Sequence, residues 1–198
     1  MIGQGKQAKT LRKAELQRLL NHVSNSRHPE RDRVMVLLSF KAGLRAKEIA
    51  LLTWSMVTDT TGELADAISL HNKASKGRAG GRMIPLHREL ADALLALKAA
   101  RVERVRPDRP VIYSERAPGY SPNAVAIWFH TRYREIGLEG ASSHSGRRTF
   151  ITAIAKRITE AGGSLRDVQE MAGHSSLSMT QRYIQGDSAA KRNVIALI

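Results

Sequence analysis

Apolar residues at helical spacing recur along most of the chain and are interrupted once, between about residues 65 and 86. Leu90, Leu94 and Leu97 are one such stripe, and this spacing places apolar side chains on one face of a helix. The interruption contains two short strand candidates, residues 67–71 and 82–86, around a segment rich in Gly, Lys and Arg. This arrangement is typical of a β-hairpin. The sequence therefore predicts a mainly α fold with one small antiparallel β-sheet, an α+β class.

Local signals mark where the predicted elements begin and end. Gly43 and Gly173 follow apolar helical stretches and are expected to end helices. Ser121 and Pro122 form a good N-cap and first-turn pair for the next helix. Residues 111–113 (VIY) are a candidate third strand, and residues 178–184 are expected to form the last helix.

The composition limits the classes of protein that the chain can belong to. Its 198 residues suffice for one well-packed domain or two small ones. The absence of cysteine excludes disulfides, thiolate zinc sites and cysteine nucleophiles. No apolar run approaches the roughly 20 residues of a membrane span, and the first residues lack the apolar core of a secretory signal. We therefore expect a cytoplasmic protein with no membrane partner.

The charge points to the kind of partner. The chain has 32 Lys and Arg against 18 Asp and Glu, a net charge of +14, and the positive residues are spread along its length. Such an excess favours a polyanionic partner, most often nucleic acid.

Several polar residues stand at the edges of predicted elements, where a ligand is within reach. Taken singly, each has an ordinary explanation: a surface ion pair, solvated lysines in a turn, a helix cap or a half-buried tyrosine. Composition and spacing alone therefore indicate a basic, helical nucleic-acid binder. The residues are Arg45, Glu48, Lys73, Lys76, His144, Arg147, His174 and Tyr183.

Their order and context resemble the tyrosine recombinase, or phage integrase, family. Residues 43–52 (GLRAKEIALL) resemble its first arginine box, and residues 76–86 (KGRAGGRMIPL) resemble its β-hairpin lysine segment. Residues 144–150 (HSGRRTF) resemble its His-x-x-Arg box, and residues 172–183 (AGHSSLSMTQRY) resemble the closing box that carries the nucleophile. The four boxes stand in family order, and the resemblance covers nearly the whole chain from Lys9 onward.

The resemblance implies the catalytic-domain fold of DNA breaking-rejoining enzymes and site-specific DNA recombination or integration. The implied reaction is a transesterification through a 3′-phosphotyrosyl intermediate, with no metal and no cofactor. The implied roles are Tyr183 as nucleophile, Arg45 and Arg147 as clamps on the phosphate oxygens, and Lys76 as the acid for the leaving oxygen. His144 is implied in proton transfer and His174 on the phosphate, two roles that can be exchanged, and Glu48 is implied to orient Arg45 or another active-site group. The hairpin turn is one residue longer than the usual pattern, so Lys73 is kept as the alternative lysine.

The resemblance also predicts partners and domain organisation. Double-stranded DNA is the expected substrate, bound by a homo-oligomer, a tetramer during strand exchange, with an accessory DNA-binding protein as a further partner. We expect a flexible N-terminal segment at residues 1–9 and a catalytic domain at 10–198, with no separate core-binding domain. The tail at 184–198 ends in an apolar stretch that docks either on a neighbouring protomer or on its own core.

Two other functions remain open at this point. A type IB topoisomerase shares the same active-site chemistry and relaxes DNA without strand exchange. A non-catalytic helix-turn-helix protein could use residues 164–184 as its DNA-binding unit, but this alternative leaves Arg45 and the basic hairpin unexplained. A metal-dependent nuclease is disfavoured because carboxylates are sparse around the boxes.

Overall fold

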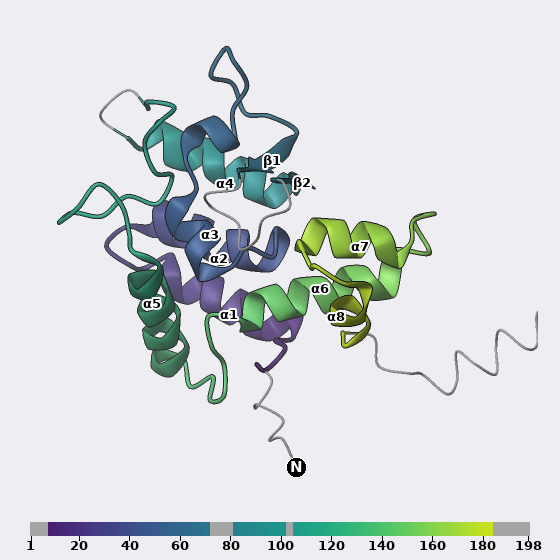
Figure 1. Cartoon of the computed structure of the whole chain (residues 1–198). Coiled ribbons are helices and arrows are strands. Elements are labelled where there is room, and N and C mark those ends of the chain that lie inside the picture. The colour runs from purple at the N-terminus through teal and green to yellow at the C-terminus, as the bar shows by residue number, and fades with distance from the viewer. Residues whose placement is uncertain (1–7, 72–80, 102–104, 184–198) are drawn as a thin grey trace, which may run out of the picture. The chain divides into compact units, whose positions relative to one another are not determined.

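The computed structural model describes residues 8–71, 81–101 and 105–183. The chain forms two compact units, Met1–Phe150 and Ile151–Ile198. The described part is mostly helical with one two-stranded antiparallel sheet, which confirms the predicted class (Figure 1). In chain order the elements are α1 (Lys13–Val23), α2 (Pro29–Lys41), α3 (Ala46–Leu51), the 3-10 turn η1 (Trp54–Met56), β1 (Ala67–Leu70), β2 (Arg82–Pro85), α4 (Arg88–Ala99), α5 (Pro122–Glu135), α6 (Ser145–Arg157), α7 (Leu165–Ala172) and α8 (Leu177–Gln181).

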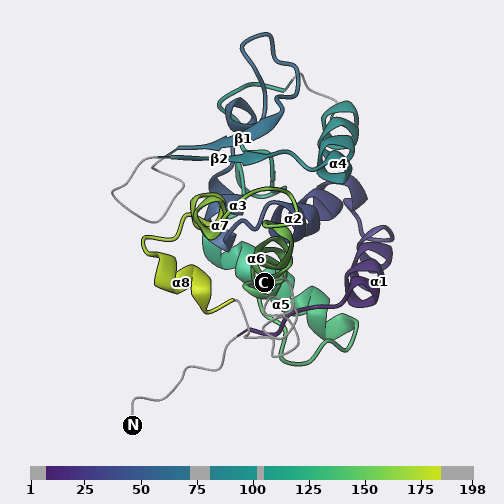
Figure 2. The same ribbon diagram turned by 90° about the vertical axis from the view of Figure 1, so that its right-hand side faces the viewer.

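Helix α2 is the centre of the first unit. It contacts α1, α3 and α4, and its residues from Val34 to Leu38 are completely buried in succession (Figure 1, Figure 2). A helix that is buried on all sides must be apolar around its whole circumference, and this stretch is Val-Met-Val-Leu-Leu. The rest of the unit is therefore built around α2.

The predicted helix boundaries are confirmed where a cap or a glycine fixes them. Gly43 follows α2 in the left-handed region with φ of 63°, and Gly173 ends α7 with φ of 60°. The hydroxyl of Ser121 accepts a hydrogen bond from the backbone N–H of Ala124 at 3.1 Å, with Pro122 in the first turn of α5. These ends depend on residues close in sequence, which is why the sequence predicts them.

Strand pairing orients Arg82 toward the interior. The register sets Ile68 opposite Ile84 and Leu70 opposite Arg82. Successive side chains of a strand alternate between two faces, so Arg82 shares a face with the buried Ile84, whereas Met83 is exposed. The side chain of Arg82 is only 8% exposed. The turn between the strands, with Lys73 and Lys76, lies outside the described residues.

The predicted third strand at residues 111–113 was wrong. Val111 and Ile112 are buried, but the segment joins the fold through an isolated bridge between Thr53 and Pro110 and a hydrogen bond from the N–H of Val111 to the carbonyl of Leu52. Pro110 has no N–H to donate, so a ladder of hydrogen bonds cannot continue through it.

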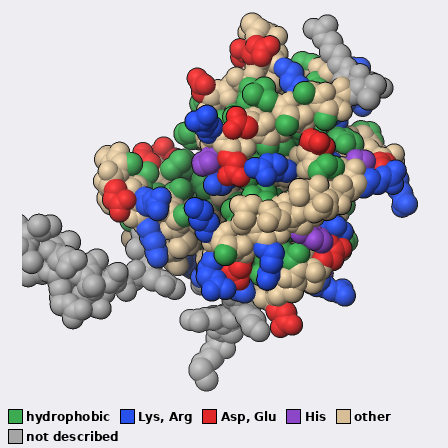
Figure 3. Space-filling model, turned by 180° about the vertical axis from the view of Figure 1, so that it is seen from behind, with side chains coloured by type: hydrophobic (Ala, Val, Ile, Leu, Met, Phe, Trp, Pro, Cys, Tyr) green, Lys and Arg blue, Asp and Glu red, His purple; other side chains and the backbone are tan. Residues whose placement is uncertain are grey.

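Charged side chains are distributed rather than gathered into one segment. On the face shown in Figure 3, Lys and Arg side chains occur at several places with acidic side chains among them. None of the helices in the described part is long and apolar enough to cross a membrane.

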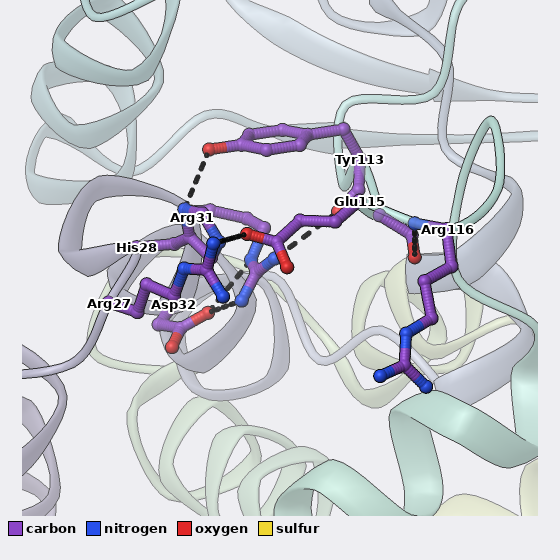
Figure 4. A network of polar contacts seen from close by, with 8 residues as sticks. Arg27, His28, Arg31, Asp32, Tyr113, Glu115 and Arg116 are labelled. Atoms are coloured by element: carbon purple, nitrogen blue, oxygen red, sulfur yellow. Dashed lines mark hydrogen bonds and ion pairs between the residues drawn. The ribbon is translucent and has the colours of Figure 1, made fainter.

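A polar network holds the segment after Pro110 against the start of α2 (Figure 4). Arg31, buried on α2, donates to Asp32 at 2.7 and 2.9 Å, and its guanidinium lies over the rings of Tyr113 and Tyr120. The ring of His28 is within 2.8 Å of a carboxylate oxygen of Glu115. Stacking and ion pairs therefore replace the strand pairing that the apolar residues suggested.

The part of the second unit up to residue 183, which the structure describes, consists of the end of α6, α7 and α8. The hydroxyl of Ser164 accepts from the N–H of Arg166, and the carboxylate of Asp167 accepts from the N–H of Ser164, which closes a capping box at the start of α7. The last helix, expected at 178–184, is α8 at Leu177–Gln181, and it packs against α7. The predicted tail at 184–198 lies outside the described residues.

We predict that Gly43→Ala destabilises the chain more than Gly62→Ala. Both glycines have positive φ, 63° and 89°, so both substitutions strain the backbone by roughly 1–2 kcal/mol. A Cβ at Gly43 would also collide with the ring of Phe150, whereas a Cβ at Gly62 meets nothing within 4 Å. Overpacking should add about 1–3 kcal/mol to the loss at Gly43. Urea unfolding of both variants measures the difference, and equal losses would contradict the close packing.

Candidate active site

Arg45 stands at the N-cap of α3, directly after the left-handed turn at Gly43. Its backbone is extended, and the carboxylate of Glu48 accepts from its N–H at 2.7 Å. The guanidinium of Arg45 also donates through Nη1 to Oε1 of Glu48 at 2.7 Å. The side chain of Arg45 is 21% exposed. The expected role of Glu48 in orienting Arg45 therefore has a geometric basis, although the catalytic role of Arg45 stays a prediction.

The same carboxylate binds a second arginine that sequence reasoning did not select. Arg82 donates through Nη1 to Oε1 of Glu48 at 2.7 Å and through Nη2 to Oε2 at 2.9 Å. Arg82 comes from β2, 34 positions along the chain from Glu48. In sequence it looked like an ordinary strand residue. Only the "R-x-I-P" context beside the lysine segment could have drawn attention to it.

Glu48 is a buried, ionised carboxylate. Burial raises its pKa, but the hydrogen bond and charge of Arg82, followed by the backbone hydrogen bond and charge of Arg45, outweigh it and lower the pKa to about 2. The carboxylate therefore stays negative at physiological pH and keeps both guanidinium groups bound.

Arg147 is fixed to the turn that precedes Arg45. It lies in the first turns of α6, is buried, and donates through Nη1 to the carbonyl of Gly43 at 2.6 Å. Gly146 permits this approach, since a Cβ there would collide with Ser39 and Phe40 of α2. Gly43 and Arg45 are two positions apart, so this bond brings the two predicted arginines to the same turn.

His144 immediately precedes α6 and is exposed. Its backbone carbonyl accepts from the N–H of Arg148 at 2.9 Å, so the first turn of the helix begins at His144. His144 and Arg147 therefore lie one turn apart on the same helix side, as their three-residue spacing predicted.

In the second unit, His174 and Tyr183 are neighbours. Their rings stack with centroids 5.5 Å apart and an interplanar angle of 22°. The left-handed Gly173 ends α7, and the buried His174 follows it. The N–H of Tyr183 donates to the carbonyl of Thr180 at 3.0 Å, which fixes the backbone just after α8. The closing box thus forms one local assembly around a half-buried tyrosine.

Thr180 is a further residue that sequence reasoning missed. It is completely buried, and its hydroxyl lies 3.0 Å from Nδ1 of His174. A hydrogen bond at one ring nitrogen fixes the orientation of an imidazole and favours one tautomer. The signal in the sequence was its position six residues after His174 within the closing box.

The structure thus groups Arg45, Glu48, Arg82 and Arg147 in the first unit and His174, Thr180 and Tyr183 in the second. Guanidinium groups suit the binding of phosphate or other oxyanions, and a tyrosine hydroxyl beside an imidazole suits nucleophilic attack. Within residues 8–71, 81–101 and 105–183, no three His, Asp or Glu side chains are grouped to hold a metal ion. Lys73 and Lys76 fall outside the described residues, so the choice between them stays a prediction.

Comparison with known proteins gives matches over almost the whole chain. Residues 9–189 match the phage integrase family. The tyrosine recombinase XerC of Actinobacillus succinogenes is 29% identical over 180 residues, which cover 90% of this chain and 57% of that protein. The tyrosine recombinase XerA of Thermococcus kodakarensis is 30% identical over 177 residues, which cover 88% of this chain and 57% of that protein. The chain therefore spans somewhat more than half the length of these two relatives.

A solved structure shares the fold. The integrase of the Tn1549 transposon, solved in complex with circular intermediate DNA, superimposes with a TM-score of 0.73 at 16% identity. The match covers 100% of this chain and 69% of that one. The fold predicted from the four boxes is therefore confirmed.

We predict that Thr180→Val removes a hydrogen-bond partner of the His174 ring and destabilises the chain. Valine keeps the shape of threonine but removes the hydroxyl partner of Nδ1, which should cost about 1–3 kcal/mol for a buried group. Urea unfolding measures the loss, and nitrogen NMR of the imidazole reports its tautomer. Thr61→Val is the control, because its hydroxyl makes an exposed hydrogen bond to Asp59. Equal stabilities and unchanged imidazole signals would contradict the role of Thr180.

Proposed function

Because this chain belongs to the phage integrase family, which matches residues 9–189, we propose that it is a tyrosine recombinase that carries out site-specific DNA recombination. The observation that carries the proposal is the stacked pair of His174 and Tyr183 in the closing box. The tyrosine ring stacks on the imidazole, and both residues stand at the positions where the family resemblance expects the nucleophile and its histidine. We assign residues 10–198 to the catalytic domain, with 184–198 as its C-terminal tail.

The proposed reaction is a transesterification at a DNA phosphodiester. The oxygen of Tyr183 attacks phosphorus and forms a 3′-phosphotyrosyl bond, while the bond from phosphorus to the 5′-oxygen breaks. The covalent intermediate keeps the energy of the phosphodiester, so the reverse attack by a 5′-hydroxyl rejoins the strand without a nucleotide cofactor.

Two arginines, Arg45 and Arg147, are assigned to stabilise the negative charge of the transition state. The non-bridging oxygens gain charge as phosphorus becomes pentacoordinate, and guanidinium groups remain charged and can bind two oxygens at once. Arg45 and Arg147 fit this role because the Gly43 turn fixes both: Arg147 donates to its carbonyl at 2.6 Å, and Arg45 follows it.

Proton transfer and phosphate hydrogen bonding are assigned to a hairpin lysine and two histidines. Lys76, or Lys73 as its alternative, protonates the leaving 5′-oxygen. His144 assists proton transfer from Tyr183, and His174 hydrogen-bonds the phosphate. These two histidine roles are interchangeable in the proposed scheme.

Double-stranded DNA is the proposed partner. The net charge of +14 supports it, as does the DNA complex of the Tn1549 integrase, which shares the fold. Strand exchange between two duplexes requires a tetramer, and an accessory DNA-binding protein would add contacts to the DNA. We propose that the protein acts in the cytoplasm, on DNA that is accessible there.

The family match disfavours the two rival functions. A helix-turn-helix unit at residues 164–184 would account for only a small part of a match that runs over residues 9–189. The curated relatives described above are recombinases, not type IB topoisomerases. Recombination is therefore the better supported outcome of the shared tyrosine chemistry.

We predict that Tyr183→Phe abolishes covalent attachment to DNA and leaves non-covalent binding nearly unchanged. The hydroxyl is the nucleophile, but it contributes little to an interface dominated by positive charge. The two proteins are incubated with fragmented DNA from their source and quenched with detergent, and protein-linked DNA is sequenced.

Tyr113→Phe is the matched control, since it removes a tyrosine hydroxyl that faces His28 in the network of Figure 4. This variant should form adducts like the wild type. An adduct that persists in Tyr183→Phe would disprove the assignment of the nucleophile.

We predict that Lys76→Ala slows cleavage by about 10²–10⁴-fold, the usual contribution of a positioned general acid. A DNA substrate with sulfur in place of the leaving 5′-oxygen should restore the rate, because a thiolate leaves without a proton. Lys73→Ala should cleave both substrates normally. The opposite pattern, with rescue confined to Lys73→Ala, would transfer the role to Lys73.

A further inference from the structure

The carboxylate of Glu48 joins two arginines from separate elements, Arg45 and Arg82, and of these two only Arg45 has an active-site role assigned above. We propose that Arg82 is a positioning residue for DNA cleavage, which acts through Glu48 to hold the guanidinium of Arg45 in place for the phosphate. This inference rests on the proposed function. It adds a residue of β2 to the machinery that the sequence boxes define.

The two arginines contact the carboxylate of Glu48 in different ways. Arg82 makes a two-pronged contact with Oε1 and Oε2 at 2.7 and 2.9 Å, whereas Arg45 contacts Oε1 alone through its side chain, at 2.7 Å. The parallel pair with Arg82 fixes the plane of the carboxylate. The direction in which Oε1 accepts from Arg45 is therefore set by Arg82.

The side chains of Glu48, Arg82 and Arg45 differ in how far they are buried. The side chains of Glu48 and Arg82 are 1% and 8% exposed, whereas that of Arg45 is 21% exposed. The anion and the strand arginine are thus interior parts, and the partly exposed arginine is the one that can meet a ligand. Buried charges are stable only when they are paired and hydrogen-bonded, so the pairing fixes all three side chains.

Charge balance explains why two cations are useful. With both arginines present, one carboxylate faces two positive charges, and the group keeps a net charge of +1 for a phosphate. Without Arg82, the whole negative charge of a buried carboxylate would fall on Arg45. Arg45 would then be drawn into a full ion pair, and its attraction for a phosphate oxygen would weaken.

The rate of cleavage tests this inference. Arg82→Gln should slow single-turnover adduct formation on the DNA site recovered with the wild type by on the order of 10²-fold, the effect of a catalytic group displaced by about 1 Å. Arg82→Lys keeps a cation without the two-pronged contact and should fall in between. Arg33→Gln is the charge-matched control, because it removes one arginine that pairs with Glu89, and it should cleave like the wild type.

The pH dependence separates positioning from a purely structural role. The described charged groups that contact the Glu48 carboxylate are Arg45 from the start of α3 and Arg82 from β2. Their interaction is present above the pKa of Glu48 and is lost as pH falls through it. In the wild type this pKa is about 2, so no loss from Glu48 is expected between about pH 5 and 8. In Arg82→Gln the arginine that counteracts the effect of burial on Glu48 is gone, so the pKa of Glu48 should rise. The cleavage rate of this variant should then fall as the pH is lowered toward that pKa.

Carboxyl-carbon NMR follows Glu48 without DNA and applies even where a variant is slow. Its signal should titrate at a higher pH in folded Arg82→Gln than in the wild type, and circular dichroism checks the fold. If Arg82→Gln cleaves as fast as Arg33→Gln, the positioning role of Arg82 is overturned. The proposed function then still stands, provided that the wild type forms its adduct. A slow variant whose pH profile and Glu48 titration match the wild type would overturn the positioning role also. Absence of a wild-type adduct would instead overturn the proposed function, and the inference with it.

Discussion

The hydrogen bond from Arg147 to the carbonyl of Gly43 is the interaction on which the placement of the two predicted active-site arginines depends. It joins residues 104 positions apart at 2.6 Å, in a buried setting where an unpaired guanidinium would be costly. Two glycines make it feasible: Gly43 adopts the left-handed turn against Phe150, and Gly146 lets α6 approach α2. Since Arg45 is the N-cap of α3, two positions after Gly43, one packed junction locates both arginines.

Acidic residues organise the cations of this basic chain. Asp32 and Glu48 are both buried in a protein of net charge +14, and each holds an arginine within 2.7 Å. Asp32 fixes Arg31, whose guanidinium lies over the rings of Tyr113 and Tyr120, and Glu48 fixes Arg45 and Arg82. A positive surface binds DNA without regard to geometry, whereas these few interior carboxylates give particular guanidinium groups a fixed direction.

Short-range features were predictable because their causes lie within a few residues. The turn at Gly43, the cap at Ser121 and the stop at Gly173 each satisfy helix-end groups from neighbouring positions, and all three occur as predicted. The strand expected at residues 111–113 failed for the same reason in reverse. Apolar residues there indicate burial, but whether a strand forms depends on a distant partner, and Pro110 limits that pairing to a bridge.

The sequence by itself determined the family, the mainly helical class and the identity of the boxes, because these are patterns of residue type and local spacing. Glu48 beside Arg45 follows from three-residue spacing at a helix start, and so does His144 beside Arg147. Only the tertiary structure decided that Arg82 shares the Glu48 carboxylate and that Thr180 orients His174. Arg82 lies in a strand and contacts a carboxylate 34 positions away only once the sheet has packed on the core. The hydroxyl of Thr180 reaches the imidazole of His174 only when α7 ends at Gly173 and α8 packs against α7.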